Sequence, residues 1–178
     1  MAWWILPLFL LNPARAQEKV ILEWQATYFG PDTLSTPVGL AADRFGSIYV
    51  TGYIFVAGVR WDRATAKYTS VGEQVWVDRT PHPENFSSFP VGVIVDNDLL
   101  YVGSHHGKPG AGGGSYQSVI QYDLDGNQGW LTSFEGRRYG NAIAIDVDGG
   151  GNIYLCGYGF DSEGRFGVEI AKLWMQTV

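Results

Sequence analysis

The stretch "GSIYVTGY", residues 46–53, decides the fold, because two near copies of it follow in the same chain. They read "DLLYVGSH" at residues 98–105 and "GNIYLCGY" at residues 151–158. The central tyrosines of the copies are 52 and 53 residues apart: Tyr49, Tyr101 and Tyr154. A text that recurs at a fixed period is the signature of a repeat architecture.

The residues around these copies recur as well. "PVGLAAD" at 37–43 and "PVGVIVD" at 90–96 match closely, and "GNAIAID" at 140–146 takes the same place in the third copy. This alignment makes three acidic residues equivalent: Asp43, Asp96 and Asp146. Three tryptophans recur at intervals of 52 and 54 residues: Trp24, Trp76 and Trp130. The repeat unit is therefore about fifty residues long.

Each unit holds four short β segments, separated by turn residues that tolerate positive φ. In the first unit the segments are Gly39–Ala42, Ile48–Tyr53, Ala64–Thr69 and Gln74–Arg79. Four antiparallel strands in a unit of this length are typical of a β-propeller blade. The sequence thus predicts an all-β fold with about three propeller blades, which is a partial propeller. The tryptophans are expected on the outermost strands, where they cover the blade rim.

The N-terminal sequence has the features of a segment that is cleaved off during export. Ala2–Leu11 is an apolar run too short to cross a bilayer, and the small-x-small triplet Ala14–Ala16 follows it. We expect a signal peptide at residues 1–16 and a secreted or periplasmic protein with no stable membrane span. The repeat region, 17–178, divides into a closing strand at about 20–29, blades at 37–79 and 90–134, and an incomplete blade at 140–178.

Composition narrows the function. The formal net charge is −6 and no basic run is present, which argues against a nucleic-acid partner. The only cysteine, Cys156, forms no intrachain disulfide and is predicted to be a buried, inert thiol. No cofactor is predicted.

The motifs resemble the bacterial SBBP-type β-propeller repeat. The resemblance is carried by "DRFGSIYVTG" at 43–52, by the Lys-Tyr and Trp of residues 67–76, and by "WQATYFGP" at 24–31, and it extends over about Ile21 to Lys172. It implies an exported protein whose propeller is a binding or scaffolding module, and it transfers no catalytic residue.

Three blades cannot close a ring, and an open array exposes apolar faces at both ends. The sequence favours a fragment of a longer propeller, because the chain ends at "MQTV", without the turn and the closing-strand Trp expected there. The alternative is a homodimer in which two chains complete a six-bladed ring, with the strand around Trp24 exchanged between chains.

Any ligand is expected on the face built by the long loops. The linker 80–90 and the loop 104–116 belong to one blade and one face, and they carry every histidine of the chain. Such histidines suit a metal or general-base site. However, His105 and His106 are neighbours on an extended chain and point opposite ways, so solvated loop histidines are favoured.

Two further loops, 136–141 and 161–167, occupy the same face of the third blade. The predicted ligand-binding residues of the loop face are His82, Glu84, His105, His106, Lys108, Arg137, Arg138, Tyr139 and Arg165. "DLDGN" at 123–127 and "DVDGGGN" at 146–152 resemble calcium loops but lack the distal Glu, so hairpin turns are predicted there. The Gly-rich stretch 107–115 lacks the ending of a phosphate loop and is predicted to be a plain loop.

Two function classes follow. The preferred one is a non-catalytic exported propeller module that binds a protein, carbohydrate or small ligand on the loop face. The alternative is a propeller-type enzyme, namely a hydrolase, lyase or quinone-dependent dehydrogenase, with His82 or His105 as base or ligand. No acidic residue or histidine recurs at one loop position across the blades, which favours the first class.

Overall fold

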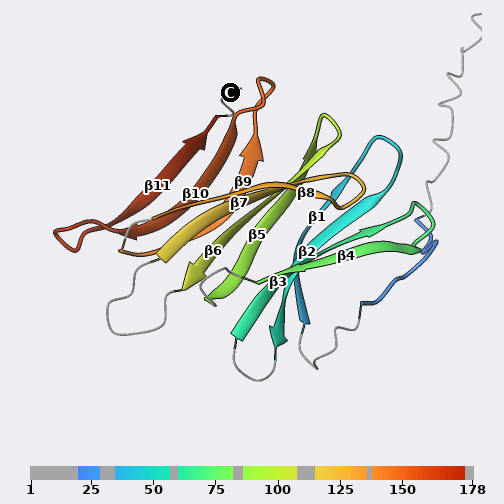
Figure 1. Ribbon diagram of the computed structural model, residues 1–178, viewed down its shortest axis with the longest axis horizontal. Helices are drawn as coiled ribbons and strands as arrows, with labels where there is room; N and C mark the ends of the chain where they lie inside the picture. Colours follow the sequence, from blue (N-terminus) through green and yellow to red (C-terminus); the bar gives the residue numbers. More distant parts are fainter. Residues whose placement is uncertain are drawn as a thin grey trace, which may run out of the picture.

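The computed structural model describes residues 20–28, 35–56, 60–81, 86–107, 115–135 and 138–174. These residues form strands and no helix, and the strands make three antiparallel sheets that do not close into a ring (Figure 1). Blade 1 contains β1 (Ser35–Ala42), β2 (Ile48–Val56), β3 (Arg60–Tyr68) and β4 (Gln74–Thr80). Blade 2 contains β5 (Ser87–Asp96), β6 (Leu99–Gly107), β7 (Ser115–Asp123) and β8 (Gln128–Glu135), and blade 3 contains β9 (Arg138–Val147), β10 (Ile153–Phe160) and β11 (Phe166–Leu173). The predicted all-β partial propeller is confirmed.

Within each blade the strands follow chain order, so the repeated tyrosine phrase lies on a strand with neighbours on both sides. The second strand of blade 1 starts at Ile48 as predicted, but it continues to Val56, and β3 begins at Arg60 rather than at Ala64. Both strands therefore extend further toward the loop face than predicted, because the backbone of residues 54–56 pairs with that of residues 60–62.

The hairpin turns form where the turn residues predict them. The four predicted turn glycines of the short hairpins have φ between +78° and +91°: Gly46, Gly72, Gly126 and Gly151. Blade 2 lacks such a glycine between its first two strands, and there Asn97 and Asp98 adopt positive φ of 47° and 62°. Two consecutive residues of this kind, from the residue types that tolerate it, close a two-residue hairpin.

One predicted equivalence is wrong. In blade 1 the Asp43 carboxylate accepts the Ser47 N–H at 2.9 Å and the Tyr49 hydroxyl at 3.1 Å. In blade 3 the residue with these contacts is Asp148, whose carboxylate accepts the Tyr154 hydroxyl at 2.9 Å. Asp146 instead lies on β9 opposite Tyr154. Two aspartates two residues apart satisfy the same strand pattern, and the turn geometry selects the second.

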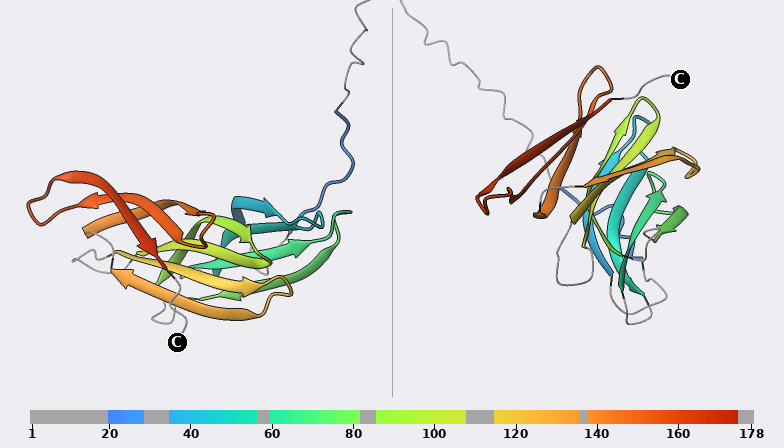
Figure 2. Two further views of the ribbon diagram at one scale, coloured as in Figure 1. Left: turned by 90° about the horizontal axis from the view of Figure 1, so that it is seen from above. Right: turned by 60° about the vertical axis from the view of Figure 1, so that its left-hand side comes forward.

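The core lies between the blades. Tyr49 of blade 1 packs with Leu100 and Val102 of blade 2, and Tyr101 of blade 2 packs with Leu155 of blade 3. We call the side of a blade that carries the repeated tyrosine its front face and the opposite side its back face. Each front face thus packs on the back face of the next blade, as the stacked sheets of Figure 2 show.

The tryptophans belong to these interfaces. Trp76 on β4 packs against the core between blades 1 and 2, and Trp130 on β8 packs against the core between blades 2 and 3. Their rings lie 6.1 Å and 6.2 Å from those of Tyr49 and Tyr101. Their position on outermost strands is as predicted, but they fill the space between blades rather than only covering a rim. Residues 20–28, expected to be a closing strand, have no strand partner in the described part of the single chain.

Candidate functional site

The two adjacent histidines lie in strand β6 and not in a loop. His105 pairs with Gln117 of β7, and His106 pairs with Tyr116. Because successive residues of a strand point to opposite faces, His105 lies on the front face of blade 2 and His106 on its back face. The expectation that they cannot share one metal agrees with this geometry, whereas the expectation of solvated loop residues is wrong.

His106 is a buried member of a polar network. It is 2% exposed, and its ring nitrogens contact the hydroxyls of Ser88 at 2.9 Å and Ser118 at 2.6 Å. These serines come from β5 and β7, the two strands that flank β6. The network satisfies both ring nitrogens inside the fold, so His106 is not available to a ligand on the surface.

A buried arginine lies beside this network, at the interface between blades 1 and 2. Arg63 is 2% exposed, and its guanidinium donates to the Ser104 hydroxyl at 3.0 Å. Nearby, the Tyr122 hydroxyl donates to the Asp78 carboxylate at 2.6 Å. Burial lowers the pKa of Arg63, and interactions with Tyr122 and Asp78 oppose that shift. The buried cation therefore has a neutral hydroxyl as its hydrogen-bond partner and a carboxylate nearby, while its Nε atom has no partner among the described residues.

His105 has a different environment. Its ring stacks on Phe89 at 5.3 Å, and its Nδ1 atom is buried with no hydrogen-bond partner among the described residues. Burial lowers the pKa of His105, while a hydrogen bond with the Ala142 backbone opposes the shift. A neutral imidazole in an aromatic environment follows from this geometry.

The lowered pKa of His105 makes a prediction about pH. The unfolded chain takes up a proton near the ordinary value of 6.5, whereas the folded chain resists it to lower pH. The free energy of unfolding should therefore fall as pH drops from about 7 through the ordinary histidine range. Urea unfolding of the wild type and of His105→Gln, at a series of pH values, measures this loss. A slope that the variant retains in full would contradict the assignment to His105.

Aromatic side chains gather next to His105 at the loop end of blades 1 and 2. The Tyr53 ring lies 5.1 Å from that of Trp61 and 5.5 Å from that of Phe89. The Phe55 ring lies 4.8 Å from Trp61. We call these five residues, Tyr53, Phe55, Trp61, Phe89 and His105, the loop-end aromatic cluster. All five are partly exposed.

Sequence reasoning missed this cluster, apart from His105. The sequence contains one indication of it: Tyr53 stands at the expected end of the second strand, and Phe55 continues the same alternation beyond that end. The contact with Phe89 joins two blades, and no local pattern predicts which aromatic residues meet across an interface. On the same strand Arg60 bonds Asp62 at 2.8 Å, and by alternation these two side chains lie on the face opposite Trp61.

The other predicted ligand-binding residues do not join this cluster. Arg165 lies in the turn between β10 and β11, where it pairs with Asp161 at 2.8 Å and Glu163 at 3.3 Å. Arg138 and Tyr139 lie at the start of β9. Four predicted residues lie outside the described part of the chain: His82, Glu84, Lys108 and Arg137.

The two calcium-like motifs form hairpin turns, as predicted. The Asp123 carboxylate accepts the Asn127 side chain and backbone N–H groups, each at 2.8 Å. Asp148 contacts Asn152 in the same way, and these hydrogen bonds, led by the Asn152 side chain, lower the pKa of Asp148. The carboxylate oxygens are thus used by the turns themselves. In the described residues no group of three His, Cys, Asp or Glu side chains is placed to hold a metal ion.

A search of the described residues for an apolar helix long enough to span a membrane finds none. In a comparison with protein families, the model for the beta-propeller repeat called SBBP matches residues 26–58. The matched segment runs from the end of the Trp24 segment through β1 and β2. No curated protein matches the chain significantly.

Proposed function

Because the chain carries an SBBP-type β-propeller repeat, built into propeller-type blades, we propose that it is an exported, non-catalytic recognition module that binds a polypeptide partner through the loop-end aromatic cluster. The cluster is the observation that carries the proposal. Trp, Tyr and Arg are enriched among the residues that dominate binding energy at protein interfaces. Here Trp61 and Tyr53 lie together at 5.1 Å, with Phe55 and Phe89 beside them.

The surroundings of the cluster support a binding role over a catalytic one. His106 has both ring nitrogens occupied by serines, and the Nδ1 atom of His105 is buried while its ring stacks on Phe89. A general base needs an accessible nitrogen within reach of a substrate proton. Export is supported by the apolar run and the small-x-small triplet before Gln17. If these blades belong to a longer propeller, the loop-end aromatic cluster keeps the same proposed role.

Surface plasmon resonance on the immobilised protein tests the proposal. Exported proteins of the source cells are passed over it, and the retained polypeptide is purified and titrated. Trp61→Ala should weaken its binding at least tenfold, which corresponds to about 1.4 kcal/mol for an interface hot spot. Val71→Asp, in a turn between β3 and β4, is the matched control and should bind like the wild type. Equal binding by Trp61→Ala, or no saturable binding by the purified polypeptide, would contradict the proposal.

A further inference from the structure

We propose that two copies of the chain associate head to tail, with the front face of blade 3 in each copy packed on the back face of blade 1 in the other. The contact would form a closed six-bladed ring. The inference rests on comparing the two uncovered faces with the same faces of blades that are covered. It is independent of the ligand proposed for the loop end.

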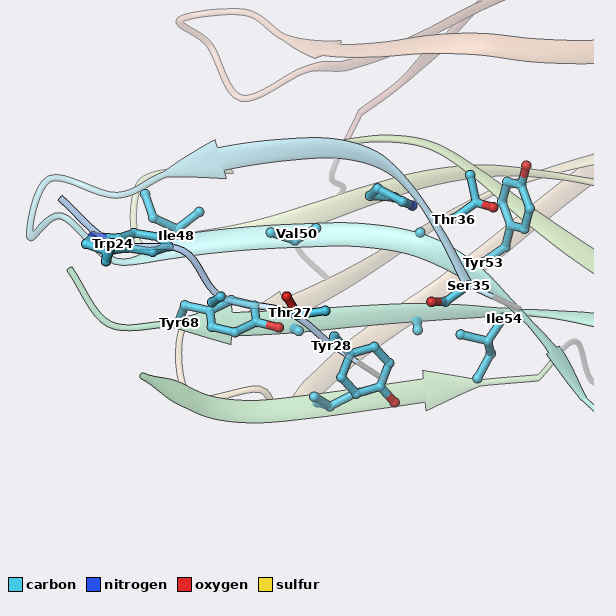
Figure 3. A pocket seen from close by; sticks show the side chains of 16 residues that line it. Trp24, Thr27, Tyr28, Ser35, Thr36, Ile48, Val50, Tyr53, Ile54 and Tyr68 are labelled. Atoms are coloured by element: carbon cyan, nitrogen blue, oxygen red, sulfur yellow. The ribbon is translucent and has the colours of Figure 1, made fainter. Parts of the chain in front are cut away.

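The back face of blade 1 carries apolar residues like those of a packed blade face, but no blade packs on it. Leu40 pairs with Val50 on this face and is 71% exposed. Val93, which pairs with Val102 in the same register of blade 2, is 6% exposed because blade 1 packs on it. Beside β2, this face of blade 1 holds a cavity of about 370 Å³, with Ile48 and Val50 along it and the Trp24 ring at one end (Figure 3).

The front face of blade 3 is uncovered as well. Ile170 pairs with Cys156, two residues beyond the repeated tyrosine, and is 71% exposed. The residues in the same register of blades 1 and 2 are Thr65 and Val119, and they are 1% and 0% exposed. The position is buried wherever another blade follows. An exposed isoleucine here marks a surface that lacks its neighbour.

Blade 3 also carries the contact group of a covered front face. The Tyr154 hydroxyl donates to Asp148 at 2.9 Å, as the Tyr49 hydroxyl donates to Asp43 at 3.1 Å. Tyr49 is fully buried against the back face of blade 2, while Tyr154 is partly exposed. In the proposed dimer Tyr154 would pack on Ile48 and Val50 of the second copy and fill part of the cavity.

The Trp24 segment supplies the missing outer strand. The Trp24 indole donates to the Ser70 carbonyl of blade 1 at 3.0 Å, and the Trp76 indole donates to the Leu124 carbonyl of blade 2 at 3.2 Å. Residues 20–28 therefore lie on blade 1 as β4 lies on blade 2, which is the place of a preceding blade's outermost strand. Among the described strands, blade 3 ends at β11, whose outer edge is unpaired. In the dimer, residues 20–28 of one copy would pair with β11 of the other and remove that open edge.

The geometry selects two copies. The two complementary faces lie at opposite ends of the stack of blades, so one chain cannot bring them together (Figures 1 and 2). Propellers have typically 4–8 blades, and two copies with three described sheets each would give six. A head-to-tail contact closes a ring when the rotation between blades permits it.

Analytical ultracentrifugation of the purified chain, over concentrations from nanomolar to high micromolar, tests the proposal. The wild type should have twice the mass of one chain. Ile170→Asp should have the mass of one chain, because it places a charge in the interface. Ile170 is mostly exposed within a single copy, so the variant keeps its own packing, which circular dichroism checks. The control is Val71→Asp, which should have the same mass as the wild type. Val71 corresponds to Asp125, and Asp125 is exposed although both faces of blade 2 are covered by other blades.

The Cys156 thiol gives a second measurement on the wild type. Cys156, predicted from the sequence to be buried, is partly exposed in the single chain. It lies in the register of Gly103, where an added Cβ would come within 2.8 Å of a Leu155 side chain from the next blade. The thiol should therefore react slowly with a maleimide when the dimer is populated, and faster on dilution and in Ile170→Asp. A single-chain mass at every concentration would overturn the proposal and leave the open faces to further blades of a longer chain. A dimer that Ile170→Asp leaves intact, or a thiol rate that does not change on dilution, would also overturn it.

Discussion

Arg63→Met is expected to lower the free energy of unfolding by about 1–3 kcal/mol, because it removes the donor to the buried Ser104 hydroxyl and a cation near the Tyr122–Asp78 hydrogen bond. Arg63 is 2% exposed and lies beside the Asp78 carboxylate, which is bonded to the Tyr122 hydroxyl at 2.6 Å. Without the guanidinium, the buried Ser104 hydroxyl loses its donor and the half-buried Asp78 carboxylate loses a nearby cation. Urea denaturation at one fixed protein concentration measures the loss, since association also contributes to stability.

Two variants separate this effect from the general loss of an arginine. Arg44→Met removes an exposed pair, Arg44 with Asp98 at 2.8 Å, and should change stability by less than about 0.5 kcal/mol. Asp78→Asn combined with Arg63→Met removes the uncompensated charge and keeps an acceptor for Tyr122, so it should recover part of the loss. Equal losses in the two single arginine variants would show that the burial of Arg63 contributes nothing special to stability.

Gly126→Ala is expected to lower the free energy of unfolding by about 2–5 kcal/mol, the sum of a backbone term of about 1–2 kcal/mol and an overpacking term of about 1–3 kcal/mol. The glycine has φ of +91°, and an added Cβ would lie 2.8 Å from the Trp76 ring. That ring is held between Tyr49 and Tyr122 and by a hydrogen bond to the Leu124 carbonyl, so it has little room to move.

Gly164→Ala isolates the backbone term. Gly164 has φ of +77° and no atom within 4 Å of an added Cβ. It should therefore cost only about 1–2 kcal/mol. Thermal or urea unfolding of both variants gives the difference, which reports the contact between one blade's tryptophan and the next blade's turn. If the two variants lose the same stability, the tryptophan moves freely and the contact does not hold the blades together.

The local structure of the blades could be predicted well because it depends on neighbours in the chain. The text "GSIYVTGY" supplies a strand that is apolar on both faces, and Asp43, Gly46 and Gly72 supply the turns that return the chain. Hairpin partners are close in sequence, so strand order followed from the repeat. The one shifted equivalence, Asp146 for Asp148, arose where two aspartates suited the same alternation.

The candidate site could be predicted only in part. The glycines that follow His105 and His106 in the sequence predict a loop there. In the structure, backbone pairing with β7 extends the strand to Gly107. The burial of His106 depends on serines 18 and 12 residues away. The aromatic cluster and the Arg63 network depend on contacts between blades, and these join residues tens of positions apart, as in the 41 residues between Arg63 and Ser104.

The sequence by itself determined the blade, because a repeated pattern of apolar, turn and tyrosine residues specifies four strands through local pairing and alternation. Only the tertiary structure decided which side chains meet between blades, and hence that His105 joins an aromatic cluster while His106 is buried. It also decided which faces are covered: Thr65 and Val119 are buried and Ile170 is exposed, although all three occupy one position of the repeat. Burial depends on whether another sheet lies against a residue, and the text of a single blade does not contain that information.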